Sequence, residues 1–274
     1  MGLVVCKVSY VIEGKTIDLI DSDWKYLALL DAARYDYFRE VYKSYVREGT
    51  LKRAESDTLS TPAWLQNFKD KDCKDIVYLN TVVKFDHWLP KHNMFRVHHI
   101  WDTHWDKQLG TIHSKSVNEV FLKEYKKYPD KRFVLHYMQP HSPYITIGGQ
   151  PTETKEQHVT DERYIPKKKK FVRDYISGHL SEATAWSIKR HLGIKSGIPV
   201  EAYYRKYGKE GVIEVYKNEI KMVLSYVVDL MNKTNGKWLI TADHGVMLGE
   251  RGNFGECYAD VKEVREVPWL EVVV

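Results

Sequence analysis

The sequence has few cysteines and no long apolar segment, and each absence argues against a class of protein. Its three cysteines, Cys6, Cys73 and Cys257, lie far apart and form no Cys-x-x-Cys pair. This spacing argues against a zinc ribbon and a disulfide framework, so we expect a reducing, cytoplasmic location. No run approaches the roughly 18 apolar residues of a membrane-spanning helix, and the first ten residues do not resemble a signal peptide. We therefore expect no transmembrane segment and no secretory leader.

The charge balance is nearly even. The chain carries 42 Lys and Arg residues against 37 Asp and Glu residues, a net charge of +5. This mild excess is compatible with an anionic substrate, but it does not indicate a nucleic-acid partner. The one dense basic run, residues 167–170, falls in a stretch of about 148–170 that we expect to be a surface excursion.

Short apolar runs alternate with amphipathic segments along the chain, and 274 residues suffice for one large domain. Strands are predicted at residues 4–12, 25–31, 75–80, 95–101, 132–141, 238–240 and 266–274. Helices are predicted at residues 37–48, 116–127, 171–191, 198–208 and 212–234, with a further helix start near Thr61. The alternation predicts a single domain, residues 1–274, built as a three-layer α/β/α sandwich with a mostly parallel central sheet.

Three of the predicted strands end in residues capable of chemistry. Asp31 ends the first of them, His141 ends the second, and Asp243 and His244 follow the third. The carboxyl ends of parallel strands meet at one sheet edge, where open α/β folds bind ligands. Asp and His are also good ligands for Zn²⁺ or Mn²⁺. The alternative is a set of loop residues without chemistry, and for His136 we expect a core histidine with its hydrogen bonds satisfied.

A hydroxyl pair precedes Pro62, a residue suited to the first turn of a helix. Pro62 makes Thr61 a better predicted N-cap than Ser60. A hydroxyl at a helix N-terminus lies where backbone N–H groups favour an anion. Together with the carboxylates and imidazoles, it would make a metal-activated nucleophile for an anionic ester.

Several segments resemble the alkaline phosphatase and sulfatase superfamily. Residues 26–36 look like its opening metal motif, residues 239–250 are similar to its Asp-His-Gly motif, and Val267-Pro268 resembles the turn that follows. Residues 133–144 resemble the Pro-His-x-Pro segment of sulfatase-like members. The likeness covers about residues 25–270 and is closest to an uncharacterised archaeal sulfatase-like group, which shares Thr-Pro-x-Trp, Met-Gln-Pro-His and the stretch 101–111.

The resemblance implies an alkaline-phosphatase-like fold and a role for each matching residue. Asp31, Asp243 and His244 match metal ligands. Thr61, or else Ser60, matches the covalent nucleophile, which also contacts the metal. His141 matches a position that touches the anionic group of the substrate. Arg34 either helps to hold that group or forms a structural salt bridge with Asp36.

Two departures from the family pattern bear on the expected chemistry and on the expected number of metal ions. Formylglycine sulfatases have Cys or Ser two residues before the proline and Arg two residues after it. Here Ser60 fills the first position, but Trp64 replaces the Arg. This favours plain hydroxyl chemistry on phosphate esters. The second departure is that Glu250, Glu256 and Cys257 stand where relatives supply another His. This favours one divalent metal, Mn²⁺ or Zn²⁺, and leaves a second metal open. A single metal, Mn²⁺, is what the similar lipoteichoic-acid-synthase-like branch uses.

We therefore predict a metal-dependent hydrolase or transferase of phosphate mono- or diesters. Its substrate would be a small-molecule or a glycan- or lipid-linked anionic ester. Sulfate-ester hydrolysis on the same scaffold is one alternative, and a non-catalytic protein that binds an anion or glycan is another. The oligomeric state stays open.

Overall fold

The computed structural model describes residues 9–82, 86–149, 184, 198–256 and 260–274. Their core is a nine-stranded sheet in the order β2-β1-β4-β11-β8-β3-β7-β5-β6. The strands are β1 (Tyr10–Ile12), β2 (Lys15–Ile17), β3 (Tyr26–Leu30), β4 (Thr50–Ser56), β5 (Cys73–Asn80), β6 (Met94–His99), β7 (Arg132–Tyr137), β8 (Lys237–Thr241) and β11 (Glu266–Val273). A separate hairpin pairs β9 (Met247–Leu248) with β10 (Phe254–Gly255).

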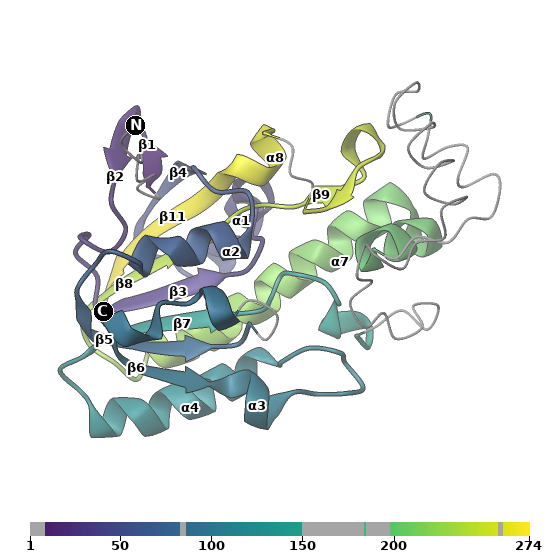
Figure 1. Ribbon diagram of the computed structural model, residues 1–274. Helices are drawn as coiled ribbons and strands as arrows, with labels where there is room; N and C mark the ends of the chain where they lie inside the picture. The colour runs from purple at the N-terminus through teal and green to yellow at the C-terminus, as the bar shows by residue number, and fades with distance from the viewer. Residues whose placement is uncertain (1–8, 83–85, 150–183, 185–197, 257–259) are drawn as a thin grey trace, which may run out of the picture.

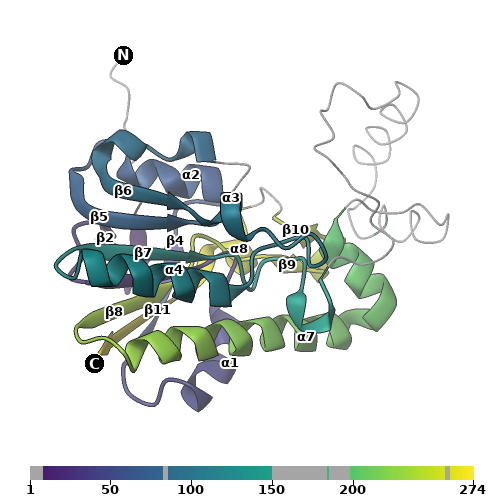
Figure 2. The same ribbon diagram turned by 90° about the horizontal axis from the view of Figure 1, so that it is seen from below.

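Helices cover both faces of the sheet (Figures 1 and 2). They are α1 (Tyr35–Val41), α2 (Thr61–Leu65), α3 (Ile100–His104), α4 (Ser114–Lys127), α7 (Pro199–Met231) and α8 (Lys262–Arg265). Short 3-10 turns cover Tyr42–Ser44, Gln66–Phe68, Asp86–Trp88, Lys91–Asn93, Ile145–Ile147 and Glu250–Gly252. In Figure 2, α4 and α7 lie across the same face of the sheet, and α2 lies on the other. The predicted three-layer α/β/α sandwich is confirmed.

The central part of the sheet is parallel, as predicted. β3 pairs in parallel with β7 and β8, and β5 pairs in parallel with β6 and β7. The prediction missed an antiparallel extension at one edge, where β11 pairs with β8 and β4, and β1 pairs with β4 and β2. The carboxyl ends of β3, β7 and β8 consequently lie side by side.

Successive side chains of β7 point to opposite faces of the sheet. Phe133 packs edge-on against Phe121 of α4, with ring centroids 5.1 Å apart, and the Tyr137 hydroxyl reaches Asn118 of the same helix. His136, one residue out of phase, instead faces Trp64 of α2, with ring centroids 6.2 Å apart. The period of two therefore directs His136 toward the α2 layer.

Most predicted elements are found with shifted ends, and four differ more. The strand predicted at 132–141 is β7, which ends at Tyr137 before the loop that carries His141. The two helices predicted at 198–208 and 212–234 form one helix, α7, in which Gly208 is non-helical with φ 72°. The strand predicted at 95–101 ends at His99 because α3 follows, and the helix predicted at 37–48 is the shorter α1. Of the strand predicted at 4–12, β1 covers residues 10–12. Residues 1–8, the helix at 171–191 and all but the start of the excursion at 148–170 fall outside the described residues.

Candidate active site

The turn that follows β3 presents Asp31 at the carboxyl edge of the sheet. The Asp31 backbone N–H donates to the carbonyl of Tyr137 on β7 at 3.0 Å. Ala32 then adopts a left-handed conformation with φ 62°, which a residue with a side chain rarely does. Tyr216 of α7 holds this turn, since its hydroxyl donates to the Ala32 carbonyl at 2.7 Å and accepts the Arg34 N–H at 2.9 Å. The Asp31 side chain is only 4% exposed.

Asp243 and His244 follow β8 and are fully buried. Asp243 Oδ1 accepts the backbone N–H groups of Ala32 at 3.1 Å and of His244 at 2.9 Å, which joins the two strand ends. The Asp243 carbonyl accepts two hydrogen bonds. One comes from the hydroxyl of Ser56, the last residue of β4, at 2.7 Å, and the other from the hydroxyl of Thr58, two residues later, at 3.2 Å. Ser56 and Thr58 were not foreseen from the sequence, because no local pattern links them to Asp243.

Thr61 begins α2, and its hydroxyl points into the same site. Thr61 Oγ1 donates to Asp243 Oδ2 at 2.8 Å and lies 3.4 Å from His244 Nε2. The predicted capping role of Thr61 is wrong. Ser60 occupies the N-cap position, and neither hydroxyl makes a capping hydrogen bond. The Thr61 hydroxyl is bound to Asp243 instead, and the Ser60 side chain is only partly buried.

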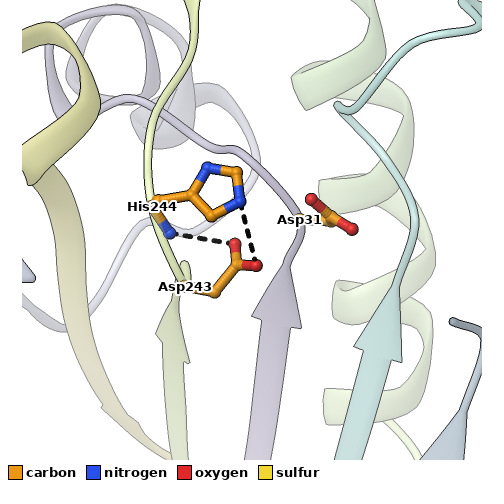
Figure 3. A group of neighbouring side chains, drawn as sticks. All are labelled: Asp31, Asp243 and His244. Carbon is orange, nitrogen blue, oxygen red and sulfur yellow. Dashed lines mark hydrogen bonds and ion pairs between the residues drawn. The ribbon is translucent and has the colours of Figure 1, made fainter. Parts of the chain in front are cut away.

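Asp31, Asp243 and His244 bring their potential ligand atoms within 4.8 Å of one another (Figure 3). Burial, together with the charge of Asp243, raises the pKa of Asp31 to about 8. For His244, burial favours the neutral ring, but the carboxylates of Asp243, Glu256 and Asp31 outweigh it and raise its pKa. Asp31 Oδ1 has no hydrogen-bond partner among the described residues.

These three side chains fit a divalent cation. Two buried carboxylates that repel each other, one with an unsatisfied oxygen, leave negative charge that a cation would offset. Carboxylate oxygens and an imidazole nitrogen are ligands that Zn²⁺ and Mn²⁺ accept.

His141 lies in the loop after β7, with Glu256 beside it. His141 Nε2 and Glu256 Oε1 are 2.9 Å apart, and the two side chains are 30% and 25% exposed. Burial favours the neutral imidazole, but Asp31 and Glu256 outweigh it and raise the pKa of His141 to about 10. Asp31, His141 and Glu256 also form a second group whose ligand atoms lie within 4.8 Å. From the sequence, Glu256 was noted only as a residue that follows the Asp-His-Gly motif.

The buried guanidinium of Arg34 is held by acidic neighbours. Its Nη2 lies 2.6 Å from Asp36, its Nη1 lies 2.5 Å from Glu250, and Nη1 also donates to the Val246 carbonyl at 3.2 Å. These contacts fit the structural alternative, a salt bridge with Asp36. Contact between Arg34 and a substrate stays a prediction.

Trp64, at the position of the sulfatase arginine, supports the strand end instead of facing solvent. It is fully buried, and its indole N–H donates to the Tyr10 hydroxyl at 2.7 Å. That hydroxyl donates in turn to the carbonyl of Ala242, the residue before Asp243, at 2.7 Å. The two hydrogen bonds therefore tie α2, which carries Thr61, to the end of β8.

Comparison with known proteins gives matches at the level of structure. No family model matches the sequence, and neither does any curated protein. The soluble domain of lipooligosaccharide phosphoethanolamine transferase A from Neisseria meningitidis superposes with a TM-score of 0.57 at 12% identity, over 96% of this chain and 79% of that chain. The zinc complex of the C-terminal periplasmic domain of EptC from Escherichia coli gives a TM-score of 0.51 at 10% identity, over 97% and 76%. A putative sulfatase from Bacteroides thetaiotaomicron gives 0.53 at 11% identity, over 93% and 65%.

No helix of the described residues combines the length and apolar character that a membrane span needs. Each of these structures superposes over more than nine-tenths of this chain. The chain therefore has an alkaline-phosphatase-like fold, shared with phosphoethanolamine transferases and sulfatases.

Proposed function

We propose that this protein is a metal-dependent hydrolase or transferase of phosphate mono- or diesters, with the Thr61 hydroxyl as its nucleophile. One observation carries the proposal. The Thr61 hydroxyl donates to Asp243 at 2.8 Å, within a cluster whose other members, Asp31 and His244, can ligate a metal.

The cluster suits one divalent cation, which we propose to be Zn²⁺ or Mn²⁺. Asp31, Asp243 and His244 would hold it, and Thr61 Oγ1 lies close enough to Asp243 to share the site. When bound, such an ion lowers the pKa of a hydroxyl and offsets charge that develops on a phosphoryl group. The zinc bound to the structurally similar EptC domain supports a metal at this site.

Residues of the chain would orient the nucleophile and bind the ester. Asp243 orients the Thr61 hydroxyl through the 2.8 Å hydrogen bond, which leaves its lone pairs free to attack phosphorus. As the new O–P bond forms, the Thr61 hydroxyl proton would pass to Asp243 Oδ2, and the ester oxygen would leave and take up a proton from solvent. The product is a phosphothreonine that water or an acceptor alcohol then resolves. His141, made cationic by Asp31 and Glu256, would bind an anionic oxygen of the ester.

His141 and Glu256 raise the question of a second metal. Their ligand atoms and Asp31 lie close enough to hold one. The ion pair of 2.9 Å between His141 and Glu256 already balances both charges, and both side chains are partly exposed. We therefore propose one metal, and measuring bound metal per chain by mass spectrometry of the digested protein would separate one equivalent from two.

The substrate class can be tested with matched esters. We would assay an aryl phosphate monoester, a diaryl phosphate diester and an aryl sulfate side by side, with Mn²⁺ or Zn²⁺ added. We expect turnover of a phosphate ester that Thr61→Ala abolishes and Ser60→Ala retains. Preferred turnover of the sulfate would favour the sulfatase alternative, which the likeness to a sulfatase fold supports.

Two further measurements separate the remaining alternatives. Faster product release on addition of an acceptor alcohol would indicate transfer, since the alcohol then competes with water for the phosphothreonine. Failure to bind Mn²⁺ or Zn²⁺, together with no turnover of any ester, would favour a non-catalytic protein that binds an anion or glycan. The natural ester, whether on a small molecule, a glycan or a lipid, requires a wider panel of substrates.

A further inference from the structure

A fully buried histidine, His136, lies directly beneath the candidate metal cluster. It belongs to β7, paired in register with Leu29, two residues before Asp31 on β3. Its ring faces Trp64 and Tyr78, so it has no contact with bulk water. A buried imidazole needs a partner for each ring nitrogen, because an unpaired polar atom in the core is costly.

Tyr78 satisfies one nitrogen and fixes the tautomer of the ring. The Tyr78 hydroxyl lies 2.8 Å from His136 Nδ1. Among the described residues this hydroxyl has no other hydrogen-bond acceptor, so it donates its proton to Nδ1. A neutral imidazole that accepts at Nδ1 carries its own hydrogen on Nε2. The N–H bond at Nε2 is therefore the free donor of His136.

That free donor lies near Asp31. His136 Nε2 lies 3.9 Å from Asp31 Oδ2 and has no hydrogen-bond partner among the described residues. Asp31 Oδ1 is also without one. The separation exceeds a normal N–H···O hydrogen bond by about 1 Å, so the two groups are close but not bonded in the metal-free protein. A buried donor without a partner thus lies close to a buried carboxylate that has one unsatisfied oxygen.

We propose that His136 is a positioning residue for Asp31. It would hold the carboxylate in the orientation that ligates the metal, while Tyr78 holds His136 in the required tautomer. Ligating side chains in metal sites are oriented in this way by outer hydrogen bonds, whose loss typically weakens metal binding 10–100-fold. The inference rests on the proposed function, since it takes Asp31 to be a metal ligand.

Two substitutions of His136 separate a positioning role from simple packing. In His136→Gln the side-chain amide can reach the Nε2 position and still donate to Asp31. In His136→Asn the shorter amide reaches only the Nδ1 position, beside Tyr78. Titration calorimetry with Mn²⁺ and with Zn²⁺ should give a dissociation constant raised about 10–100-fold for His136→Asn and within about threefold of wild type for His136→Gln.

A pair of tyrosine variants provides a matched control. Tyr78 and Tyr137 are both fully buried on neighbouring strands, and each hydroxyl makes a hydrogen bond, to His136 and to Asn118 respectively. Tyr78→Phe should weaken metal binding several-fold, because the tautomer of His136 is no longer fixed. Tyr137→Phe should leave metal binding unchanged, although it should lower the melting temperature by about as much as Tyr78→Phe does.

The visible absorption of bound Co²⁺ gives a second readout, which a purely structural role would not alter. We expect the Co²⁺ bands to shift in His136→Asn and Tyr78→Phe and to stay unchanged in His136→Gln and Tyr137→Phe. Equal metal affinity and equal spectra in all four folded variants would overturn the inference while leaving the proposed function intact. A wild-type protein that binds none of the three metals would overturn the proposed function itself.

Discussion

The hydroxyl of Thr61 and the carboxylate of Asp243 are joined by a hydrogen bond of 2.8 Å, although 182 positions separate the two residues in the sequence. One residue opens α2 and the other follows β8, so the bond depends on how these elements pack. Trp64 and Tyr10 stabilise that packing, since their hydrogen bonds link α2 to Ala242. The nucleophile and the metal ligand are thus held together by the core.

Replacing Thr61 with Ala should abolish turnover of the preferred phosphate ester. The loss of kcat/KM should be at least about 10³-fold, because no other group replaces a covalent nucleophile. Thr61→Ser should keep part of the activity, since it retains a hydroxyl. Ser60→Ala is the control and should stay near wild type, because the Ser60 side chain makes no capping hydrogen bond. If Ser60→Ala were the inactive variant, the nucleophile would be Ser60.

Asp31 should make the stability of the metal-free protein fall as the pH rises. Its pKa is raised from the ordinary 3.8 to about 8, so the native state binds more protons than the unfolded chain between these values. The stability that this group contributes is fully present below about pH 4 and is lost as the pH passes about 8. Melting temperatures of the chelator-treated protein across this range would show the trend, and Asp31→Asn should flatten it.

The same titration predicts how metal binding depends on pH. A cation requires the ionised Asp31 carboxylate, so the increase in melting temperature caused by Zn²⁺ or Mn²⁺ should grow as the pH approaches about 8. A metal-induced increase that did not vary with pH would show that Asp31 is not a ligand.

Glu256 should keep His141 protonated in the metal-free protein. The pKa of His141 is raised to about 10 because the carboxylates of Asp31 and Glu256 outweigh the effect of burial. Glu256→Gln removes one of these charges, so the pKa of His141 should fall, and the ring should lose its proton at a lower pH. NMR titration of the His141 ring protons, assigned by their absence in His141→Ala, measures this directly. An unchanged titration midpoint would contradict the role given to Glu256.

The strand ends could be predicted from the sequence because their signals are local. Residues 26–30 and 238–240 are short apolar runs, each followed within three residues by a carboxylate, and parallel strands bring such ends to one edge. That reasoning predicts Asp31 and Asp243 at one edge of the sheet, and the structure adds that their strands, β3 and β8, are neighbours. The tail, residues 266–273, was also recognisable as a strand, but its antiparallel pairing with β8 and β4 was not.

Other parts of the site depend on contacts that leave no local pattern. Ser56 and Thr58 bond the Asp243 carbonyl from β4 and the residues after it, and Tyr216 reaches Ala32 from 184 positions away. The pairing of Glu256 with His141 likewise appears only once both loops are placed. The helix cap was predicted wrongly because the pattern before Pro62 gives no sign that Asp243 binds the Thr61 hydroxyl.

The glycine of the Asp-His-Gly motif should be required for folding of the site. A Cβ atom on Gly245 would lie 2.2 Å from the Glu263 carbonyl oxygen and 3.1 Å from Arg34 Cγ. The Gly245 N–H also donates to the Val264 carbonyl, so the backbone cannot easily move away. We expect Gly245→Ala to lower the free energy of unfolding by about 1–3 kcal/mol or more. Urea unfolding measures this, with exposed Ser225→Ala, expected within about 0.5 kcal/mol of wild type, as the control.

The central claim is that Asp31, Asp243 and His244 hold a metal beside Thr61. Anomalous diffraction from crystals soaked in Mn²⁺ or Zn²⁺ tests it most directly. We predict one strong peak about 2.0–2.3 Å from a carboxylate oxygen of Asp31, a carboxylate oxygen of Asp243 and a ring nitrogen of His244. A cluster without a peak at saturating metal, or a peak bound only by His141 and Glu256, would contradict the claim.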